Sequence, residues 1–203
     1  MKVIAINGSP RKDGNTYLAL KTACDILNAE GIETEIVNVG ALNITGCKAC
    51  GGCANAGKCV INDGFNELAE NIAAADGIIV GTPVYYAGIN GTLKSFLDRF
   101  FYVHSSKMRF KPAAALTALR RSGVTHTYQT IYNFFTISEM LITPTSYWPG
   151  VHGRLKGEAE QDLEGIQVAR GIGRNMAYLL KMKAESNIPV PEKEPKEMFN
   201  YIR

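Results

Sequence analysis

The sequence has little net charge, few histidines and no long hydrophobic run. No apolar stretch approaches the roughly 20 residues of a membrane-spanning helix. A net charge of +3 over 203 residues is too small to indicate binding to nucleic acid or to an anionic membrane. The apolar stretch at residues 1–6 is too short for a signal peptide. We therefore expect a cytoplasmic protein with no nucleic-acid partner and no membrane partner.

Standard signatures of nucleotide-binding and hydrolytic enzymes are also missing. The chain contains neither G-x-G-x-x-G nor G-K-[ST], which excludes the dinucleotide fingerprint and the Walker loop. Its histidines, His104, His126 and His152, show neither metal-ligand spacing nor a pattern typical of nucleophilic catalysis. We predict no catalytic side chain, and chemistry that a bound cofactor supplies.

What the chain does contain is an alternation of short β-branched runs with amphipathic stretches. Strands are predicted at residues 3–6, 33–39, 77–81, 113–119 and 141–143, and helices at 15–29, 65–75, 93–102, 128–140 and 158–183. Five βα units in succession predict an α/β fold, a doubly wound five-stranded parallel sheet in three α/β/α layers. We expect one domain over residues 1–186 with a Cys-rich insert at 40–62, then an extended tail at 187–203.

The loop between the first strand and first helix has the composition of a phosphate site. Residues 7–16 read Asn-Gly-Ser-Pro-Arg-Lys-Asp-Gly-Asn-Thr. A helix N-terminus there offers free N–H groups and a partial positive charge. The candidate donors to a phosphate are Ser9, Arg11, Asn15 and Thr16. The alternative is a capped helix after a polar turn, because Asn and Thr are common caps.

Four of the five cysteines lie close together in the sequence. Cys47, Cys50, Cys53 and Cys59 follow the spacing C-x2-C-x2-C-x5-C. This packing suits a cubane iron–sulfur cluster better than a zinc site, whose cysteine pairs are usually further apart. Zinc or free thiols remain alternatives. Cys24 lies on an apolar helical stripe and is predicted to be core.

These motifs resemble those of one protein group. Gly-Ser-Pro-Arg-x-x-Gly-Asn-Thr at residues 8–16 is similar to the FMN phosphate loop of the NADPH-dependent FMN reductase and iron–sulfur flavoprotein group, which has the flavodoxin-like fold. The resemblance covers residues 1 to about 123 and continues more loosely beyond. It implies FMN held at its phosphate by the four donors named above. It also implies a [4Fe–4S] cluster on the four clustered cysteines, which we expect on the flavin's side of the sheet.

Two further loops are expected to surround the flavin ring. The group has a Pro-Val-Tyr-type loop followed by Gly-x-x-Lys-x-Phe-x-Asp-Arg, which residues 83–99 match. The first of these loops supplies Pro83, Val84, Tyr85 and Tyr86, and the second supplies Ala118, Leu119, Arg120 and Gly123. Relatives often have a Gly-rich stretch where this chain has Arg120 and Arg121. The two arginines are expected to meet an anionic flavin edge or a nicotinamide nucleotide phosphate, or to form a solvated turn.

Three functions follow from the resemblance. The first is an iron–sulfur flavoprotein whose cluster passes electrons from a donor such as ferredoxin to FMN and on to a small-molecule acceptor. The second is a cluster-free NAD(P)H-dependent reductase of FMN, quinone, nitro or azo compounds. The third is a non-enzymatic flavodoxin-type shuttle, which the positive charge disfavours. Aromatic residues at 128–135, with Phe199 and Tyr201 in the tail, predict a homodimer or homotetramer.

Overall fold

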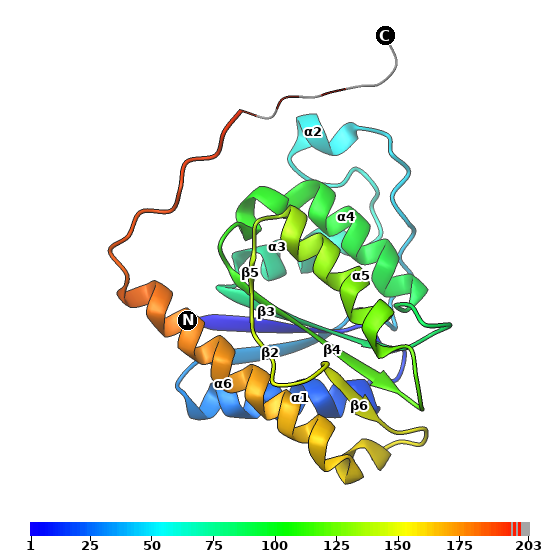
Figure 1. Cartoon of the computed structure of the whole chain (residues 1–203). Coiled ribbons are helices and arrows are strands. Elements are labelled where there is room, and N and C mark those ends of the chain that lie inside the picture. Colours follow the sequence, from blue (N-terminus) through cyan, green and yellow to red (C-terminus); the bar gives the residue numbers. More distant parts are fainter. Residues whose placement is uncertain (196, 198, 200–203) are drawn as a thin grey trace.

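A parallel β-sheet forms the centre of the computed structural model, which describes residues 1–195, 197 and 199 (Figure 1). Tyr201 lies outside the described residues. The strand order is β2-β1-β3-β4-β5, with β6 also paired to β4. The strands are β1 (Lys2–Asn7), β2 (Glu33–Asn38), β3 (Gly77–Pro83), β4 (Pro112–Leu119), β5 (Leu141–Ile142) and β6 (Gly150–His152). This order, with its reversal at β1 and β3, is that of the flavodoxin-like fold.

The predicted count of five strands is wrong, because the described residues form a sixth strand in the sheet. β5 pairs with the beginning of β4, at Pro112 and Ala113. β6 pairs with the end of β4, from Thr117 to Leu119. The two short strands thus share one edge of the sheet. A strand of three residues is too short to show periodicity, which is why the sequence pattern did not reveal β6.

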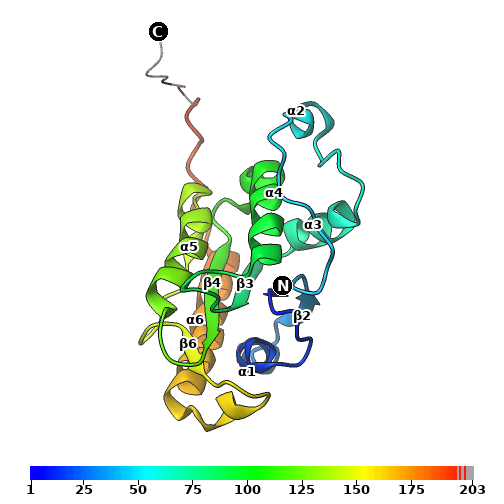
Figure 2. The same cartoon turned by 90° about the vertical axis from the view of Figure 1, so that its right-hand side faces the viewer.

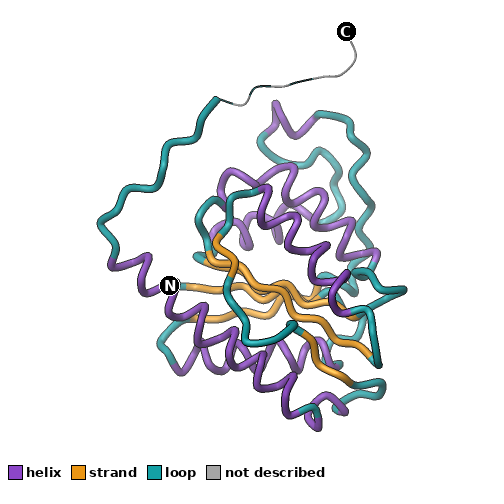
Figure 3. The backbone as a smooth tube through the Cα atoms, in the orientation of Figure 1, coloured by secondary structure: helices purple, strands orange, loops and turns teal. Residues whose placement is uncertain are grey.

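Helices cover both faces of the sheet (Figures 1 to 3). They are α1 (Asn15–Ala29), α2 (Gly52–Ala56), α3 (Phe65–Ala74), α4 (Gly91–Met108), α5 (Val124–Ile137), the 3-10 turn η1 (Glu158–Gln161) and α6 (Leu163–Glu185). α1 and α6 lie on one face, and α3, α4 and α5 on the other. The three-layer α/β/α prediction is confirmed.

Alternation along β1 shows how the strands serve two cores. Val3 and Ala5 pack toward α1 and α6, whereas Ile4 and Ile6 pack toward α3 and α4. All four side chains are completely buried. A strand buried on both faces must be apolar at successive positions, which explains the continuous apolar run in the sequence.

Capping side chains set helix limits that periodicity did not predict. Asn90 Oδ1 accepts from the Leu93 N–H at 3.1 Å, so α4 begins earlier than expected. Asp162 Oδ1 accepts from the Gly165 N–H at 2.9 Å and separates η1 from α6 within the predicted helix. None of the described helices combines the length and apolar character needed to cross a membrane.

Candidate functional site

The loop between β1 and α1 is folded by its own side chains. Asn7 Oδ1 accepts from the Ser9 N–H at 3.0 Å, and Ser9 Oγ accepts from the Arg11 N–H at 3.1 Å. The Gly8 N–H donates to the Gly81 carbonyl oxygen at 2.7 Å, which ties the loop to β3. Ser9 is buried, whereas Arg11 is exposed. The loop therefore has a backbone fixed by hydrogen bonds and two exposed cationic side chains, Arg11 and Lys12, at the carboxyl edge of the sheet.

The N-terminus of α1 is open toward this loop. Its N-cap is Gly14, and no side chain in the described part of the protein caps the helix. The capped-helix interpretation required Asn15 or Thr16 in that role. The first N–H groups of a helix lack intrahelical partners and carry a partial positive charge, so they suit an anion such as a phosphate.

The Asn15 side chain is directed to a segment that the sequence did not associate with the site. Its Nδ2 donates to the Leu155 carbonyl oxygen at 2.9 Å, and its Oδ1 accepts from the Gly157 N–H at 3.1 Å. A Cβ at Gly153 would lie 2.6 Å from Asn15 Nδ2, so only glycine fits there. Lys156 also forms an ion pair with Asp13. Residues 153–159 therefore form a wall of the phosphate loop, and no local signal at residue 15 predicts it.

The loop after β3 is a tight, exposed turn. Tyr85 and Gly88 exchange two backbone hydrogen bonds of 2.9 Å, and Tyr86 and Ala87 between them have φ angles of 49° and 58°. Positive φ at two successive non-glycine residues is strained and frequent at functional sites. Tyr86 is fully exposed and Tyr85 is half-exposed. Both aromatic rings are thus available to a ligand at this edge.

The structure brings the second and third predicted loops into contact. The Val84 N–H donates to the Ala118 carbonyl oxygen at 2.9 Å. A Cβ at Gly123, whose φ is 101°, would lie 2.9 Å from Val84 Cγ1. Ala118 and Leu119 are buried in β4, so they can reach a ligand only through the backbone. Arg120 is exposed, as are Arg121 and Ser122 beside it, so a ligand can meet these side chains directly.

Aromatic side chains line a further cavity, of about 330 Å³, beside α5. Tyr128 and Tyr132 form one wall, and Tyr147 and Trp148 form the other. The rings of Tyr147 and Trp148 are 4.7 Å apart at their centroids and half-exposed. The helix thus presents Tyr128 and Tyr132 to this cavity, while its Phe135 is buried in the core.

The four clustered cysteines line one cavity of about 240 Å³, together with Arg99 and Tyr102. All four are free; Cys47 and Cys50 are exposed, and Cys53 and Cys59 are half-buried. Within the described part of the chain, no three ligand side chains are close enough to hold a metal ion. The thiols thus share a cavity without converging. Cys24 is 2% exposed and belongs to the core, as predicted.

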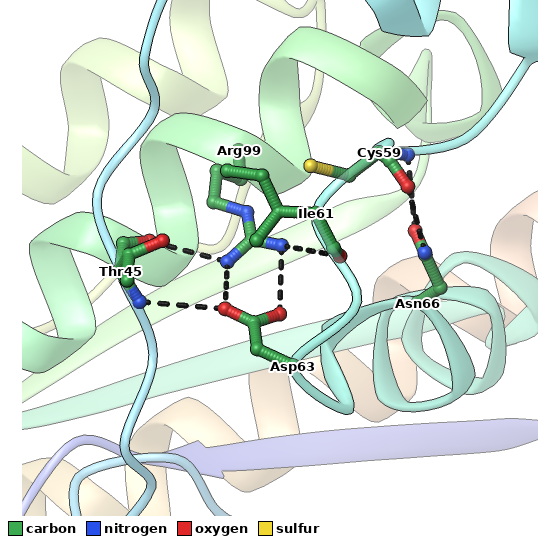
Figure 4. Close-up of polar contacts among 6 residues, drawn as sticks. All are labelled: Thr45, Cys59, Ile61, Asp63, Asn66 and Arg99. Atoms are coloured by element: carbon green, nitrogen blue, oxygen red, sulfur yellow. Dashed lines mark hydrogen bonds and ion pairs between the residues drawn. The ribbon is translucent and has the colours of Figure 1, made fainter.

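The cysteine cavity does not lie where we expected it. Its loop leaves the carboxyl end of β2 but runs outward to the far side of α4, where α2 lies (Figures 1 and 2). Arg99 is eight residues beyond Gly91, where α4 begins, which corresponds to about 12 Å along the helix. The ion pair between Arg99 and Asp63 fastens the loop to the middle of α4 (Figure 4).

The chemistry of this cavity fits an anionic iron–sulfur cluster. Four thiols supply the soft ligands that such a cluster requires. Arg99 is 1% exposed and brings a buried positive charge to the cavity wall. Its Nε is buried and has no hydrogen-bond partner among the residues described. Asp63 already pairs with the Arg99 charge, so the feature that favours an electron-rich, hydrogen-bond-accepting occupant is the unused Nε–H donor.

The sheet order, the open helix N-terminus and the loops beside it define the class of flavodoxin-like flavin proteins. A family model of NADPH-dependent FMN reductases matches residues 1–153. The chain belongs to this family and is an FMN-dependent oxidoreductase.

Curated relatives support this assignment over most of the chain. An iron–sulfur flavoprotein of Methanocaldococcus jannaschii is 37% identical over 190 residues, which cover 90% of this chain and 98% of the relative. An iron–sulfur flavoprotein of Methanosarcina thermophila is 32% identical over 187 residues, which cover 90% and 96%. These matches confirm the family that the sequence motifs predicted.

Solved structures agree on the fold. RosB with bound 8-demethyl-8-formylriboflavin-5'-phosphate superposes with a TM-score of 0.73 at 18% identity and covers 100% of this chain and 96% of its own. An archaeal flavodoxin gives a TM-score of 0.60 at 13% identity, with coverage of 89% and 99%. At these identities the likeness concerns the fold alone.

Proposed function

We propose that this oxidoreductase carries a [4Fe–4S] cluster on Cys47, Cys50, Cys53 and Cys59, and that it delivers electrons from ferredoxin or NAD(P)H to a small acceptor. The observation that carries the proposal is the single cavity lined by all four thiols and by the buried Arg99. The relatives named iron–sulfur flavoproteins add support. When bound, the cluster supplies one-electron exchange and FMN supplies one- and two-electron exchange.

In this proposal the FMN phosphate lies at the N-terminus of α1. Ser9 and Thr16 carry buried hydroxyl groups at that helix end, and the exposed Arg11 supplies a positive charge. Asn15 contributes its backbone N–H, since its side chain holds residues 155–159. The flavin ring is assigned to the loop edge with Pro83, Val84, Tyr85 and Tyr86, beside Ala118, Leu119, Arg120 and Gly123.

The experiment is iron and sulfide analysis, with low-temperature EPR, of protein purified and reconstituted without oxygen. The matched variants are Cys50→Ser and Cys24→Ser. We expect about four irons per chain in wild type and in Cys24→Ser, and a loss of most iron in Cys50→Ser. Less than about one iron per chain in reconstituted wild type, or equal iron in Cys50→Ser, contradicts the cluster.

A second candidate is a cluster-free NAD(P)H-dependent reductase of FMN, quinone, nitro or azo compounds. Two observations favour it: the exposed Arg120 and Arg121 at the flavin edge, and a Bacillus NADPH azoreductase that is 31% identical over 118 residues. That match covers 57% of each chain. Stopped-flow mixing with NADPH, NADH and reduced ferredoxin separates the candidates. Rapid flavin bleaching by NADPH in iron-free protein supports this second one.

The molecule is also proposed to assemble as a homodimer or homotetramer. Exposed apolar side chains on its helices, including Tyr102 and Ile137, support this. Sedimentation at micromolar concentration tests it, and a single species at 22.1 kDa would contradict it.

A further inference from the structure

Arg99 joins the two ends of the cysteine segment (Figure 4). Its Nη1 donates to the Thr45 carbonyl oxygen at 3.1 Å, and its Nη2 donates to the Ile61 carbonyl oxygen at 3.4 Å. Thr45 lies two residues before the first clustered cysteine, and Ile61 lies two residues after the last. One guanidinium on α4 therefore closes the base of the whole cysteine loop.

Asp63 completes this closure. Its two carboxylate oxygens accept from Arg99 Nη1 at 2.6 Å and from Nη2 at 2.9 Å, and Oδ2 also accepts from the Thr45 N–H at 3.4 Å. A bidentate pair fixes direction as well as distance. The ring of Phe65 lies 4.1 Å from the guanidinium carbon and covers its face. We call the ion pair between Arg99 and Asp63, with its contacts to Thr45 and Ile61, the clamp. Residues of α3, of the cysteine loop and of α4 all contribute to it.

The two Nη atoms of Arg99 use four of the five N–H donors of the guanidinium in bonds to Thr45, Ile61 and Asp63. The remaining donor is the Nε–H. That atom is buried and has no hydrogen-bond partner in the described part of the chain. Arg99 lines the thiol cavity, and the Cys59 side chain extends toward it in Figure 4. The charge and the free donor therefore lie at the wall of the cavity and not at solvent.

We propose that Arg99 is a positioning residue for the cysteine site: it closes residues 45–61 into a preformed cavity and directs its charge and its Nε–H to the thiolate-bound occupant. The closure follows from contacts within the protein alone. The action on an occupant rests on the proposed cluster. A preformed loop loses less conformational freedom when it binds, because its ends are already fixed.

The closure is tested on metal-free protein by trypsin. Lys48 and Lys58 are exposed within the loop, so cleavage after them reports how often it opens. The variants are Arg99→Gln, Arg99→Lys and Asp63→Asn. The control is Lys107→Gln, on the same helix as Arg99, which removes an exposed ion pair with Glu70 of α3. We expect cleavage to accelerate at least about tenfold in the three clamp variants and to stay unchanged in the control.

Alkylation of the half-buried Cys53 and Cys59, followed by mass spectrometry, is expected to accelerate in parallel, while the exposed Cys47 and Cys50 react at the wild-type rate and Cys24 stays protected. Circular dichroism and FMN titration show whether each variant retains its fold. Asp63→Asn and Arg99→Lys keep the test decisive if Arg99→Gln does not fold. Wild-type cleavage rates in folded clamp variants would overturn the proposal.

The action on the occupant is tested on reconstituted protein by redox titration with EPR detection. A nearby positive charge stabilises the more negative, reduced state, so Arg99→Gln is expected to shift the midpoint potential to a more negative value. Arg99→Lys, which retains the charge, is expected to shift it less. A potential unchanged in Arg99→Gln would overturn this part. If wild type binds no iron, the proposed cluster fails while the trypsin result still decides the closure.

Discussion

Asn15 and Leu155 are joined by a hydrogen bond between parts of the chain that lie 140 residues apart: Asn15 Nδ2 donates to the Leu155 carbonyl oxygen at 2.9 Å. Asn15 Oδ1 accepts from the Gly157 N–H at 3.1 Å and the Ala159 N–H at 3.4 Å. Both ends of the amide are therefore engaged within the protein. The residue that opens α1 at the phosphate loop also holds the wall of that loop in place.

Replacing Asn15 by Asp is expected to weaken FMN binding at least about tenfold, or roughly 1.4 kcal/mol. The aspartate lacks the donor to Leu155 and adds a negative charge beside the phosphate. Asn15→Ala removes this donor and also the oxygen that accepts from Gly157 and Ala159, but it adds no charge. It is therefore expected to lower the free energy of unfolding by about 1–3 kcal/mol and to affect FMN less. Flavin fluorescence titration and urea unfolding measure the two effects.

Asn175→Asp is the matched control, because Asn175 Nδ2 donates to the Pro144 carbonyl oxygen at 2.8 Å on the outer surface. It is expected to leave FMN affinity unchanged. Equal FMN affinity in Asn15→Asp and wild type would show that the phosphate does not lie at the start of α1.

Gly40→Ala is expected to displace the backbone of the phosphate loop at Gly8 and Ser9. A Cβ at residue 40 would lie 2.2 Å from the Gly8 carbonyl oxygen and 2.4 Å from the Ser9 carbonyl carbon. Backbone atoms cannot rotate away, so the loop must shift. We expect FMN affinity to fall about tenfold and the free energy of unfolding to fall by about 1–3 kcal/mol. Titration and urea unfolding again provide the measurements.

Gly171→Ala provides the control for this prediction. Gly171 lies inside α6, and a Cβ there would meet nothing within 4 Å. It is expected to raise the free energy of unfolding by about 0.5–1 kcal/mol without changing FMN affinity. An unchanged affinity in Gly40→Ala would mean that residues 8–9 do not contact the flavin phosphate.

Local pattern was enough to predict the fold class, because each strand of the inner sheet is an apolar run between amphipathic helices. It failed where structure depends on distant pairs. β6 pairs with β4, where Thr117 donates to the Pro149 carbonyl oxygen through both its N–H and its hydroxyl. The position of the cysteine loop depends on Arg99 and Asp63, which are 36 residues apart. Neither pairing leaves a periodic signal in the sequence.

The candidate site shows the same division. Residue types placed Ser9 and Arg11 in a loop at a strand's carboxyl end, and the structure brings that loop next to β3. The role of the Asn15 side chain depends on residues 155–159. The sequence pattern predicted only that a helix begins at residue 158, and it gave no sign that this segment contacts the phosphate loop. Spacing identifies residues that share a loop but not the segment that packs against it.

Burial raises the pKa of the Cys24 thiol from 9.0 to about 11. Between these values the folded protein keeps the proton that the unfolded chain releases. The contribution of this thiol to the free energy of unfolding is therefore complete below pH 9 and declines as the pH rises toward 11. The expected loss between pH 8 and pH 10.5 is about 2 kcal/mol, and Cys24→Ala should lack this component.

Urea unfolding at the two pH values measures this loss of unfolding free energy. Taking the difference between variant and wild type cancels the contributions of other titrating groups. Cys50→Ala, which removes an exposed thiol, is the control and should retain the wild-type pH dependence. The same dependence in Cys24→Ala and wild type would contradict the protonated, buried thiol.

The last prediction concerns the electron donor. Arg120 and Arg121 are exposed directly after β4, in the loop that contacts the β3 loop through Gly123. NADPH differs from NADH by a 2′-phosphate, and a guanidinium binds phosphate through charge-assisted hydrogen bonds. If the pair selects NADPH, Arg120→Ala with Arg121→Ala should raise the KM for NADPH at least about tenfold and the KM for NADH much less. Because these side chains bind rather than react, kcat at saturation should change little.

Arg174→Ala, an exposed arginine on α6, should leave both KM values unchanged. Added salt should raise the KM for NADPH in wild type more than in the double variant, because screening acts on the pairing that the variant has lost. An equal rise in KM for both nucleotides would place the arginines against the flavin or a shared part of the donor. Unchanged kinetics would make residues 120–121 a solvated turn. If only reduced ferredoxin supports turnover, the electrons enter by a route that does not need this loop.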